Sequence, residues 1–442
     1  MTKKNSTRRD FLKTAAVGVS AVAALNAPAV HAQGSDIIKV GIIGCGGRGS
    51  GAGDNVLHAA PGVKIVALGD AFKFRSESCR DRLRKAAQQD SVKKLNNTVE
   101  VPDANVFDGL DCHEKVLNAG VDYVILSGPP GFRPLHLQAA IKAGKNVFTE
   151  KPVCVDGPGA RKCLEAYEAA TGKKLGVAAG TQRRHQKSYL ETIKRVQDGE
   201  LGNITAMRAY WNGTGIWFRT RNDLASKNIK ATDMAYQCHN WYHFVWLCGD
   251  HIAEQHVHNL DVCNWAMGNQ HPTRCVGMGS RISRMQGKPE EVGNIFDNFA
   301  IDYEYGNGVH MLSMCRQIPN TVSDVSEAIT CAKGICQANQ SLFKDFAGKQ
   351  LWRYQGGGTD PYVQEHTDLI ESIRKGQPIN ELKNVTESSL TAVMGRMSAY
   401  TGKAVTWDQA LNSKEDTFPK TLAWDAEIIT PPAATPGKTV IS

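Results

Sequence analysis

Residues 36–43 have the sequence Asp36-Ile37-Ile38-Lys39-Val40-Gly41-Ile42-Ile43, and they lead directly into the loop Gly44-Cys45-Gly46-Gly47-Arg48-Gly49. The loop has the G-x-G-x-x-G spacing and stands where a short apolar strand ends and a helix is expected to begin. In this setting Gly44 permits a tight turn, Gly46 lets the backbone approach a pyrophosphate, and Gly49 lets the helix pack closely. The sequence therefore predicts a dinucleotide-binding unit in which all six loop residues, Cys45, Gly47 and Arg48 included, surround the cofactor.

A second predicted strand, Val63 to Leu68, ends in Gly69-Asp70. An acid at this point is placed to accept hydrogen bonds from the adenosine ribose hydroxyls and disfavours a 2′-phosphate. Lys73 and Arg75 follow closely, and their positive charge partly offsets that of Asp70. The sequence thus predicts NAD as the cofactor and leaves NADP open.

The pattern of strand and helix continues with predicted strands at 121–126 and 146–148, separated by a helix over 136–143. Ligands of such parallel, doubly wound sheets lie beyond the carboxyl ends of the strands, which brings Gly128, Pro129 and Pro130 near the cofactor. After about residue 182 longer β runs take over, including a hairpin with strands at 300–305 and 309–312. We predict an α/β fold: a Rossmann domain over 36–182, a C-terminal domain over 183–430 for substrate binding and oligomerisation, and an irregular tail over 431–442.

The N-terminal segment carries Arg8-Arg9 within Ser6-Thr7-Arg8-Arg9-Asp10-Phe11-Leu12-Lys13, followed by a weakly apolar run and small residues up to Ala32. This order of regions is typical of a twin-arginine export signal, and the run is too short to span a bilayer. We predict a signal peptide over 1–32 that engages the twin-arginine translocase. The mature protein is then expected in the periplasm or otherwise outside the cytoplasm, without stable membrane insertion.

The 442 residues include 41% hydrophobic and 22% charged residues, which excludes disordered, collagenous and multi-span membrane proteins. The net charge of +8 is partly that of the predicted signal, since without residues 1–32 the chain has 47 basic and 43 acidic residues. No basic stripe remains, so we expect a small-molecule partner and no nucleic acid. The twelve cysteines are scattered without a CxxC pair, which predicts buried free thiols and no cysteine-bound metal.

Six motifs occur in order along the chain: GIIGCGGRG (41–49), VILSGPPGFRPLH (124–136), GKNVFTEKP (144–152), GTQRRHQ (180–186), DGELGNI (198–204) and HVHNLD (256–261). Together they resemble the Gfo/Idh/MocA family of oxidoreductases, over about Ile37 to Trp407. The resemblance implies a Rossmann domain, a second α/β domain on an open and predominantly antiparallel sheet, and hydride transfer to or from sugars, cyclitols or their derivatives. It also implies a homodimer or homotetramer in which another subunit covers the open sheet, and it adds His136, Glu150 and Lys151 to the cofactor-binding residues.

Hydride transfer from a carbinol carbon needs a base for the hydroxyl proton and a cation or donor for the developing alkoxide. Lys151 follows a Rossmann strand and suits the second role. The segment 249–261 is predicted to be one helix with His251, Glu254, His258 and Asp261 on a single face. The resemblance places an acid four residues before a catalytic histidine, so His258 is the predicted general base and Glu254 its orienter or co-base. Asp261 is predicted to be an acid behind them, a helix-packing partner or a substrate contact.

Other roles stay open for these residues. His251, Glu254 and His258 have the spacing to hold a metal ion, although HExxH is absent and we predict no metal; a purely structural polar face is the other alternative. Arg183 and Arg184 follow a predicted strand and are placed to touch cofactor or substrate, or to pair with surface acids. His239 is a candidate substrate contact, and the tryptophans at 211, 217, 241 and 246 are predicted to pack in the core in preference to stacking on a sugar.

Three functions fit these observations. The leading one is an exported NAD(P)-dependent oxidoreductase that acts on a sugar, glycoside or cyclitol with a tightly bound cofactor. The second is an NAD-dependent glycosidase that oxidises C3 transiently, eliminates the aglycone and reduces the sugar again. The third is a non-catalytic sugar-binding protein on the same scaffold, against which Lys151 and His258 argue.

Overall fold

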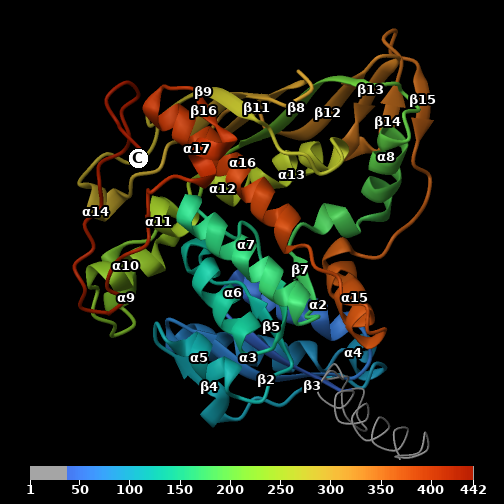
Figure 1. Cartoon of the computed structure of the whole chain (residues 1–442). Helices are drawn as coiled ribbons and strands as arrows, with labels where there is room; N and C mark the ends of the chain where they lie inside the picture. Colours follow the sequence, from blue (N-terminus) through green and yellow to red (C-terminus); the bar gives the residue numbers. More distant parts are fainter. Residues whose placement is uncertain (1–36, 442) are drawn as a thin grey trace, which may run out of the picture. The chain divides into compact units, whose positions relative to one another are not determined.

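The computed structural model describes residues 37–441, and the signal peptide predicted over 1–32 lies outside them. Two sheets organise the described chain, one in the N-terminal part and one in the C-terminal part (Figure 1). Within residues 37–441 no helix combines the length and apolar character that crossing a bilayer requires.

The first sheet is parallel, with strand order β3-β2-β1-β5-β6-β7 and β4 paired to β2. Its strands are β1 (Ile38–Ile43), β2 (Val63–Asp70), β3 (Thr98–Val99), β4 (Val106–Asp108), β5 (Tyr123–Leu126), β6 (Asn146–Thr149) and β7 (Val177–Ala179). Strand β5 is a completely buried run of apolar residues, and β1 and β2 are mostly buried and apolar, as expected when helices cover both faces of a parallel sheet. The predicted doubly wound sheet is confirmed, and the short strands β3 and β4 are additions that the sequence did not reveal.

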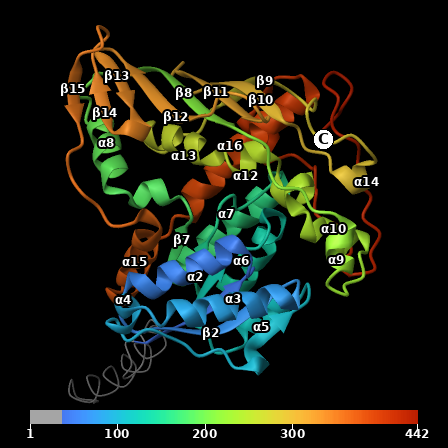
Figure 2. The same ribbon diagram turned by 180° about the vertical axis from the view of Figure 1, so that it is seen from behind.

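Helices of the first part are α2 (Gly47–Ala59), α3 (Lys73–Ala86), α4 (Asp90–Lys93), α5 (Cys112–Leu117), α6 (Arg133–Lys142) and α7 (Gly157–Gly172). Apolar residues of α2 and α3 pack on one face of the sheet, and those of α5, α6 and α7 pack on the other (Figures 1 and 2). The first strand and helix meet at the glycine loop, at the carboxyl edge of the sheet.

Helix α15 (Pro361–Arg374), which is distant in sequence, also packs against the N-terminal Rossmann part of the fold. It lies against α2, and its Leu369 and Ile370 belong to the same buried cluster as the β1–α2 residues. The Tyr123 hydroxyl of β5 lies 2.7 Å from His366 Nδ1 of α15. The N-terminal Rossmann core therefore depends on residues some two hundred positions beyond the predicted boundary at 182, which itself falls between the end of β7 and the start of β8.

The second sheet has the order β15-β14-β13-β12-β8-β11-β10-β9-β16 and is antiparallel except for the pair β8/β11. Its strands are β8 (Ile204–Gly213), β9 (Arg274–Ser280), β10 (Asn298–Glu304), β11 (His310–Gln317), β12 (Asp324–Cys331), β13 (Gly334–Gln337), β14 (Leu342–Lys344), β15 (Gln350–Arg353) and β16 (Val405–Thr406). The predicted open, mostly antiparallel sheet and the hairpin of β10 and β11 are confirmed.

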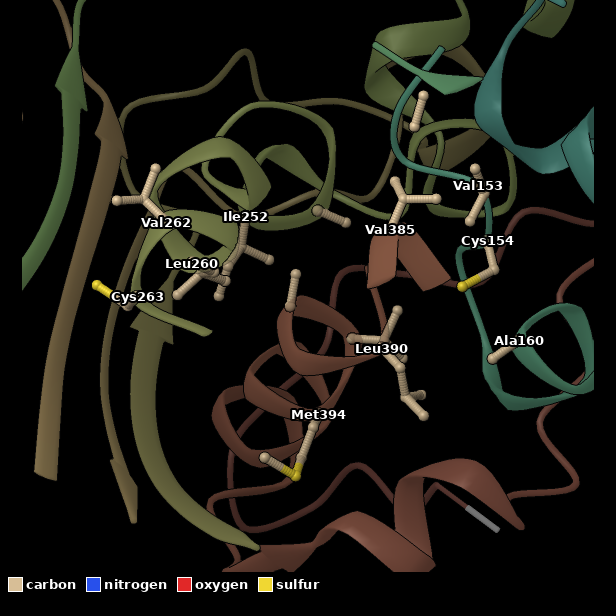
Figure 3. Close-up of a cluster of buried hydrophobic side chains, with 14 of the residues drawn as sticks. Val153, Cys154, Ala160, Ile252, Leu260, Val262, Cys263, Val385, Leu390 and Met394 are labelled. Carbon is tan, nitrogen blue, oxygen red and sulfur yellow. The ribbon is translucent and has the colours of Figure 1, made fainter. Parts of the chain in front are cut away.

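The remaining helices are α8 (Lys187–Gln197), α9 (Arg221–Ala225), α10 (Asp233–His239), α11 (Val245–Cys248), α12 (His251–Glu254), α13 (Val257–Ala266), α14 (Pro289–Val292), α16 (Leu382–Thr401) and α17 (Trp407–Leu411). Helices α12, α13 and α16 cover one face of the second sheet (Figure 1). Figure 3 shows that side chains of α16 lie in one apolar cluster with those of α12 and α13 and with Val153 and Cys154, which follow Lys151. Packing in this cluster holds in place the segment that directly follows Lys151, the candidate catalytic lysine.

The last described residues, 412–441, contain no helix or strand, so the irregular stretch begins well before the predicted tail at 431. Ile428 of this stretch is buried in a cluster with residues of α10 and α11. All twelve cysteines are buried and free, which confirms the prediction of buried thiols.

Candidate active site

The glycine loop has the geometry that its sequence predicts. Gly44 has φ +94°, and a Cβ on Gly49 would lie 1.9 Å from Gly44 O, so α2 packs directly on the loop. In contrast, a Cβ on Gly47 would meet nothing within 4 Å, and one on Gly46 would meet only the Arg75 Nη1. The loop therefore leaves open space at the N-terminus of α2, where backbone N–H groups favour an anion such as a pyrophosphate.

Asp70 lies at the carboxyl end of β2, beside this loop. The Cys45 N–H donates to its Oδ2 at 2.7 Å and the Phe72 N–H donates to its Oδ1 at 3.0 Å. Burial raises the pKa of Asp70, against the effects of Arg75 and of the amide donors, which lower it. The hydrogen bond from Cys45 to Asp70 thus links the glycine loop to the end of β2, and Asp70 also lines the cavity beside the loop.

A cavity of about 340 Å³ runs along the carboxyl edge of the first sheet. Its lining includes most residues predicted for the cofactor, namely Gly44, Gly46, Gly47, Arg48, Asp70, Gly128, Pro129 and His136. The ring of His136 stacks on the rings of His113 and Phe132, and burial lowers its pKa well below the usual range. The second part of the chain contributes Trp217, Arg219, Cys238 and Trp241, so both parts of the chain line the cavity.

A second cavity, of about 280 Å³, shares Arg48, Ser127, Gly128 and Trp241 with the first. It contains the three predicted catalytic residues, Lys151, Glu254 and His258, together with the predicted cofactor residues Pro130 and Glu150. The Lys151 Nζ donates to the backbone oxygen of Glu254 and lies 3.4 Å from its Oε1. The geometry therefore brings a cation, an acid and a histidine together next to the candidate nicotinamide site.

The electrostatics of this cavity keep His258 neutral. Burial lowers the pKa of His258 well below its usual value, and the positive charges of Lys151, Arg183 and Arg48 lower it further. Burial raises the pKa of Glu254, while Lys151 and a hydrogen bond with Tyr242 act in the opposite direction. Glu254 thus pairs with Lys151, and its carboxylate orients the lysine. The sequence had predicted that it would orient His258.

The prediction of one continuous helix over 249–261 is wrong. Helix α12 ends at Glu254 and α13 begins at Val257, and between them the His256 N–H donates to the His251 oxygen, five residues back. The break accompanies the burial of His256, whose Nε2 bonds the Ser313 Oγ of β11 at 2.7 Å. A tertiary contact with the sheet thus overrides the helical spacing.

Because of this break, the four polar residues do not share a face. The ring of His251 bonds Asp250 and packs on Phe299 in the core. Asp261 accepts from Arg184 Nε at 2.8 Å and from Ser388 Oγ at 2.8 Å. His251 and Asp261 therefore lie outside the lining of the catalytic cavity, and the triad His251, Glu254 and His258 does not converge on a metal.

Arg183 and Arg184 are committed to buried ion pairs. Arg184 is paired with Asp261, and Arg183 with Glu327, which also accepts a hydrogen bond from Asn259. Neither arginine lines the two cavities described above. Both arginines thus stabilise the structure around the site and do not line it. His239, in contrast, lies near the cofactor cavity, with its Nδ1 3.4 Å from Arg75 Nη2.

Three aromatic residues of the catalytic cavity were not predicted to lie there. Trp211 stacks on His258 with ring centroids 5.8 Å apart, and Trp241 and Tyr362 complete an aromatic lining. Arg48 lies at the junction of both cavities, paired with Glu150 and with its guanidinium 5.0 Å from the Tyr362 ring centroid. Trp246, in contrast, is a core residue. No periodicity signals this convergence, because Tyr362 comes from α15 and Trp211 from β8.

Over the described residues, 37–441, no group of three or more His, Cys, Asp or Glu side chains has an arrangement suited to a metal ion. The charged, basic and aromatic groups of the catalytic cavity are therefore one lysine, two acids (Glu150 and Glu254), one neutral histidine, two arginines (Arg48 and Arg133) and three aromatic rings.

Comparison with known proteins agrees with this geometry. Residues 38–180 match a family model described as an oxidoreductase family with an NAD-binding Rossmann fold, named for Gfo, Idh and MocA. The chain is 32% identical over 272 residues to an inositol 2-dehydrogenase of Paracoccus denitrificans, over 62% of this chain and 65% of the relative. It is 28% identical over 247 residues to that of Gluconacetobacter diazotrophicus, over 56% and 59%. The matched part thus spans about three fifths of the length of these relatives.

Solved structures share the fold at low sequence identity. Levoglucosan dehydrogenase in complex with NADH and levoglucosan has a TM-score of 0.63 at 14% identity and covers 84% of this chain and all of that one. Aldose-aldose oxidoreductase from Caulobacter crescentus has a TM-score of 0.62 at 16% identity, over 84% and 99%. The chain therefore shares the fold of these solved structures, and residues 38–180 match the NAD-binding Rossmann model of the Gfo/Idh/MocA oxidoreductase family.

Proposed function

We propose that this protein is an NAD(P)-dependent oxidoreductase that transfers hydride between its nicotinamide cofactor and a carbinol or carbonyl carbon of a sugar, glycoside or cyclitol. The observation that carries the proposal is the joint presence of Lys151, Glu254 and His258 in a cavity that opens into the predicted cofactor cavity. The inositol dehydrogenase relatives and the sugar oxidoreductase fold support the substrate class.

The residues divide the chemistry as follows. The bound nicotinamide supplies the carbon that accepts or donates the hydride. His258 is neutral, so it accepts the proton of the substrate hydroxyl, and the Lys151 ammonium donates to the same oxygen and stabilises its developing charge. Glu254 holds the ammonium through its backbone oxygen and side chain. Trp211, Trp241 and Tyr362 offer ring faces to the C–H side of a sugar or cyclitol ring.

The test is a screen of cyclitols, aldoses and glycosides for substrate-dependent formation of NADH by the purified protein and by Lys151→Ala. We expect Lys151→Ala to lower kcat/KM by about 100-fold or more, because one preorganised donor to a developing oxyanion contributes about that much. Lys162→Ala, an exposed lysine of α7, is the matched control and should keep wild-type activity. Unchanged turnover by a folded Lys151→Ala protein would contradict the assignment.

The same screen separates the two catalytic alternatives. A glycosidase that works through C3 oxidation releases the aglycone and exchanges the C2 hydrogen with solvent deuterium, whereas a dehydrogenase does neither. We propose the dehydrogenase. Aglycone release together with deuterium incorporation would instead assign Lys151, Glu254 and His258 to a glycosidase.

We further propose that the protein is exported through the twin-arginine pathway with its cofactor already bound. The support is the order of Arg8-Arg9, apolar run and Ala32 in the sequence, together with the lining of the cofactor cavity by both parts of the chain, Trp217 and Trp241 included. Arg8→Lys combined with Arg9→Lys should retain the protein in the cytoplasm, as fractionation and immunoblotting would show. An unchanged distribution would exclude this route.

A second copy of the chain is the proposed cover of the open sheet. The support is the row of apolar side chains on the face of the sheet that α12, α13 and α16 leave bare, including Val276, Met278 and Leu312. We propose a homodimer or homotetramer built on this face.

A further inference from the structure

A buried chain of hydrogen bonds connects the second sheet to the carboxylate that holds Lys151. It starts at Gln317, the last residue of β11, whose Nε2 donates to the Tyr242 hydroxyl at 2.8 Å. Tyr242 in turn hydrogen-bonds the side chain of Glu254, whose Oε1 lies 3.4 Å from the Lys151 Nζ. Tyr242 and Gln317 are only 2% and 4% exposed, so this chain of contacts is shielded from bulk solvent.

Arg284 fixes the direction of these hydrogen bonds. Its Nη2 donates to Gln317 Oε1 at 2.7 Å, and a guanidinium has no acceptor. The carbonyl of the Gln317 amide therefore faces Arg284, and its NH2 group faces Tyr242. Because the Tyr242 oxygen accepts from that NH2 group, the hydroxyl proton is available to Glu254, which can only accept while it is ionised.

The groups at the start of the chain are held by contacts that involve no substrate. The centroid of the Tyr242 ring lies 5.3 Å from that of Trp241 and 6.0 Å from that of Trp217, and the ring belongs to the main apolar cluster. The Arg284 Nε donates to the backbone oxygen of Phe296 at 2.7 Å. The Tyr242 hydroxyl therefore approaches Glu254 from a fixed direction.

The hydrogen bond from Tyr242 also favours the ionised form of Glu254. Burial raises the pKa of this carboxyl and the negative charge of Glu150 raises it further, whereas Lys151 and the Tyr242 hydroxyl lower it. The other titratable groups that face it are Cys248, Arg133 and, in the same cavity, His258. Since the ionised carboxylate pairs with the Lys151 ammonium, a donor that favours ionisation also strengthens that pairing.

We infer that Tyr242 is a positioning residue, whose hydroxyl keeps the Glu254 carboxylate directed at Lys151. Gln317 and Arg284 set the direction of the hydrogen bond. Tyr242 lines neither the cofactor cavity nor the catalytic cavity, so it acts through Glu254 and not on the substrate. The inference rests on the proposed function, because it assumes that Lys151 donates to the substrate oxygen.

The test is the pH profile of kcat/KM for Tyr242→Phe, measured as NADH formation with a substrate from the screen described above. We expect the acidic limb to lie about one pH unit or more above that of the wild-type protein, because loss of a donor to the carboxylate raises the pKa of Glu254. At pH 8, where Glu254 is ionised in both proteins, kcat/KM should fall by less than about tenfold. An acidic limb that does not move would overturn the inference.

Tyr305→Phe is the matched control. It removes an equally buried hydroxyl, which donates to Asn264 Oδ1 at 2.7 Å outside the lining of both cavities. This variant should keep the wild-type acidic limb, and a limb shifted as far as in Tyr242→Phe would show that loss of any buried hydroxyl has this effect.

A double variant tests whether Tyr242 acts through Glu254. In a Glu254→Gln background the carboxylate is already absent, so adding Tyr242→Phe should change kcat/KM by less than about twofold. A further loss as large as that in the wild-type background would contradict the inference and give Tyr242 a separate role.

Gln317→Glu keeps the inference testable if Tyr242→Phe does not fold. Glutamate accepts from Arg284 as glutamine does, but an ionised carboxylate has no hydrogen to donate, so it accepts the Tyr242 proton in place of Glu254. The acidic limb should rise as in Tyr242→Phe, and an unchanged limb would overturn the inference while sparing the proposed function. Absence of turnover by the wild-type protein in the screen would refute the proposed function and this inference with it.

Discussion

At the scale of single residues, the site depends on a histidine whose protonation its surroundings decide. His258 is stacked on Trp211 and faces the positive charges of Lys151, Arg183 and Arg48. An imidazolium in that position is disfavoured both by burial and by charge repulsion. The ring therefore stays an acceptor over the pH range in which an unperturbed histidine would take up a proton.

This electrostatic setting predicts the pH profile of the enzyme. The folded-state pKa of His258 lies well below 6.5, so the base stays deprotonated as the pH falls through 6.5, and kcat/KM for oxidation should stay level there and decline only in more acidic solution. His258→Gln should lower kcat/KM by about 100-fold or more, in keeping with the loss of a general base, and should remove the acidic limb. Kinetics between pH 4.5 and 8 check both points, and an acidic limb centred at or above 6.5 would contradict them.

The residues that the sequence identified are those whose role follows from local chain geometry. The glycine loop, Asp70 and Lys151 each directly follow or end a parallel strand, so their place at the carboxyl edge of the sheet is fixed by the strand itself. Tyr362 reaches the same cavity from α15, through packing that no local pattern records. Contacts of that kind between distant segments decide the rest of the site.

At the scale of elements, the break between α12 and α13 is the clearest departure from the sequence pattern. Periodicity describes one helix at a time, whereas His256 is buried by its bond to Ser313 in the neighbouring sheet. The break turns Glu254 toward Lys151 and Asp261 toward Arg184. Of the polar residues predicted to share one helix face, Glu254 and His258 therefore line the catalytic cavity, whereas Asp261 forms a structural ion pair.

That division predicts different consequences for substitution of the two acids. Asp261 and Arg184 are both buried, so Asp261→Asn leaves an unpaired buried guanidinium and should cost about 3 kcal/mol of unfolding free energy. KM should be unchanged, because the pair lies outside the lining of the catalytic cavity. Glu191→Gln, which breaks the partly exposed pair with Arg195 on α8, is the control and should cost less than about 1 kcal/mol. Urea titrations measure both, and a raised KM with unaltered stability would return Asp261 to the substrate site.

At the scale of the whole molecule, the second sheet is covered on one face only by the described chain (Figure 1). The strand register aligns outward residues across it, since Asp302 lies opposite both Val276 and Leu312, and Ala300 lies opposite both Met278 and Met314. Met278 is 72% exposed and Leu312 is 40% exposed, although both are large apolar side chains in the interior of long strands. A broad, flat face with apolar rows is typical of a surface that a second subunit buries.

The oligomer proposed on this face is therefore sensitive to charge placed in those rows. Met278→Arg combined with Leu312→Arg should shift the protein to the mass of a single chain, as sedimentation velocity or light scattering would measure, because two unpaired cations then stand in a desolvated interface. Leu135→Arg introduces the same charge at an exposed leucine on α6 of the Rossmann domain and should leave the mass unchanged. The catalytic cavity lies on the face of the sheet that the helices cover, since Trp211 of β8 lines it and stacks on His258 of α13, so a dissociated protein should still bind NAD. A double variant that keeps the wild-type mass would show that the assembly, if one forms, uses another surface.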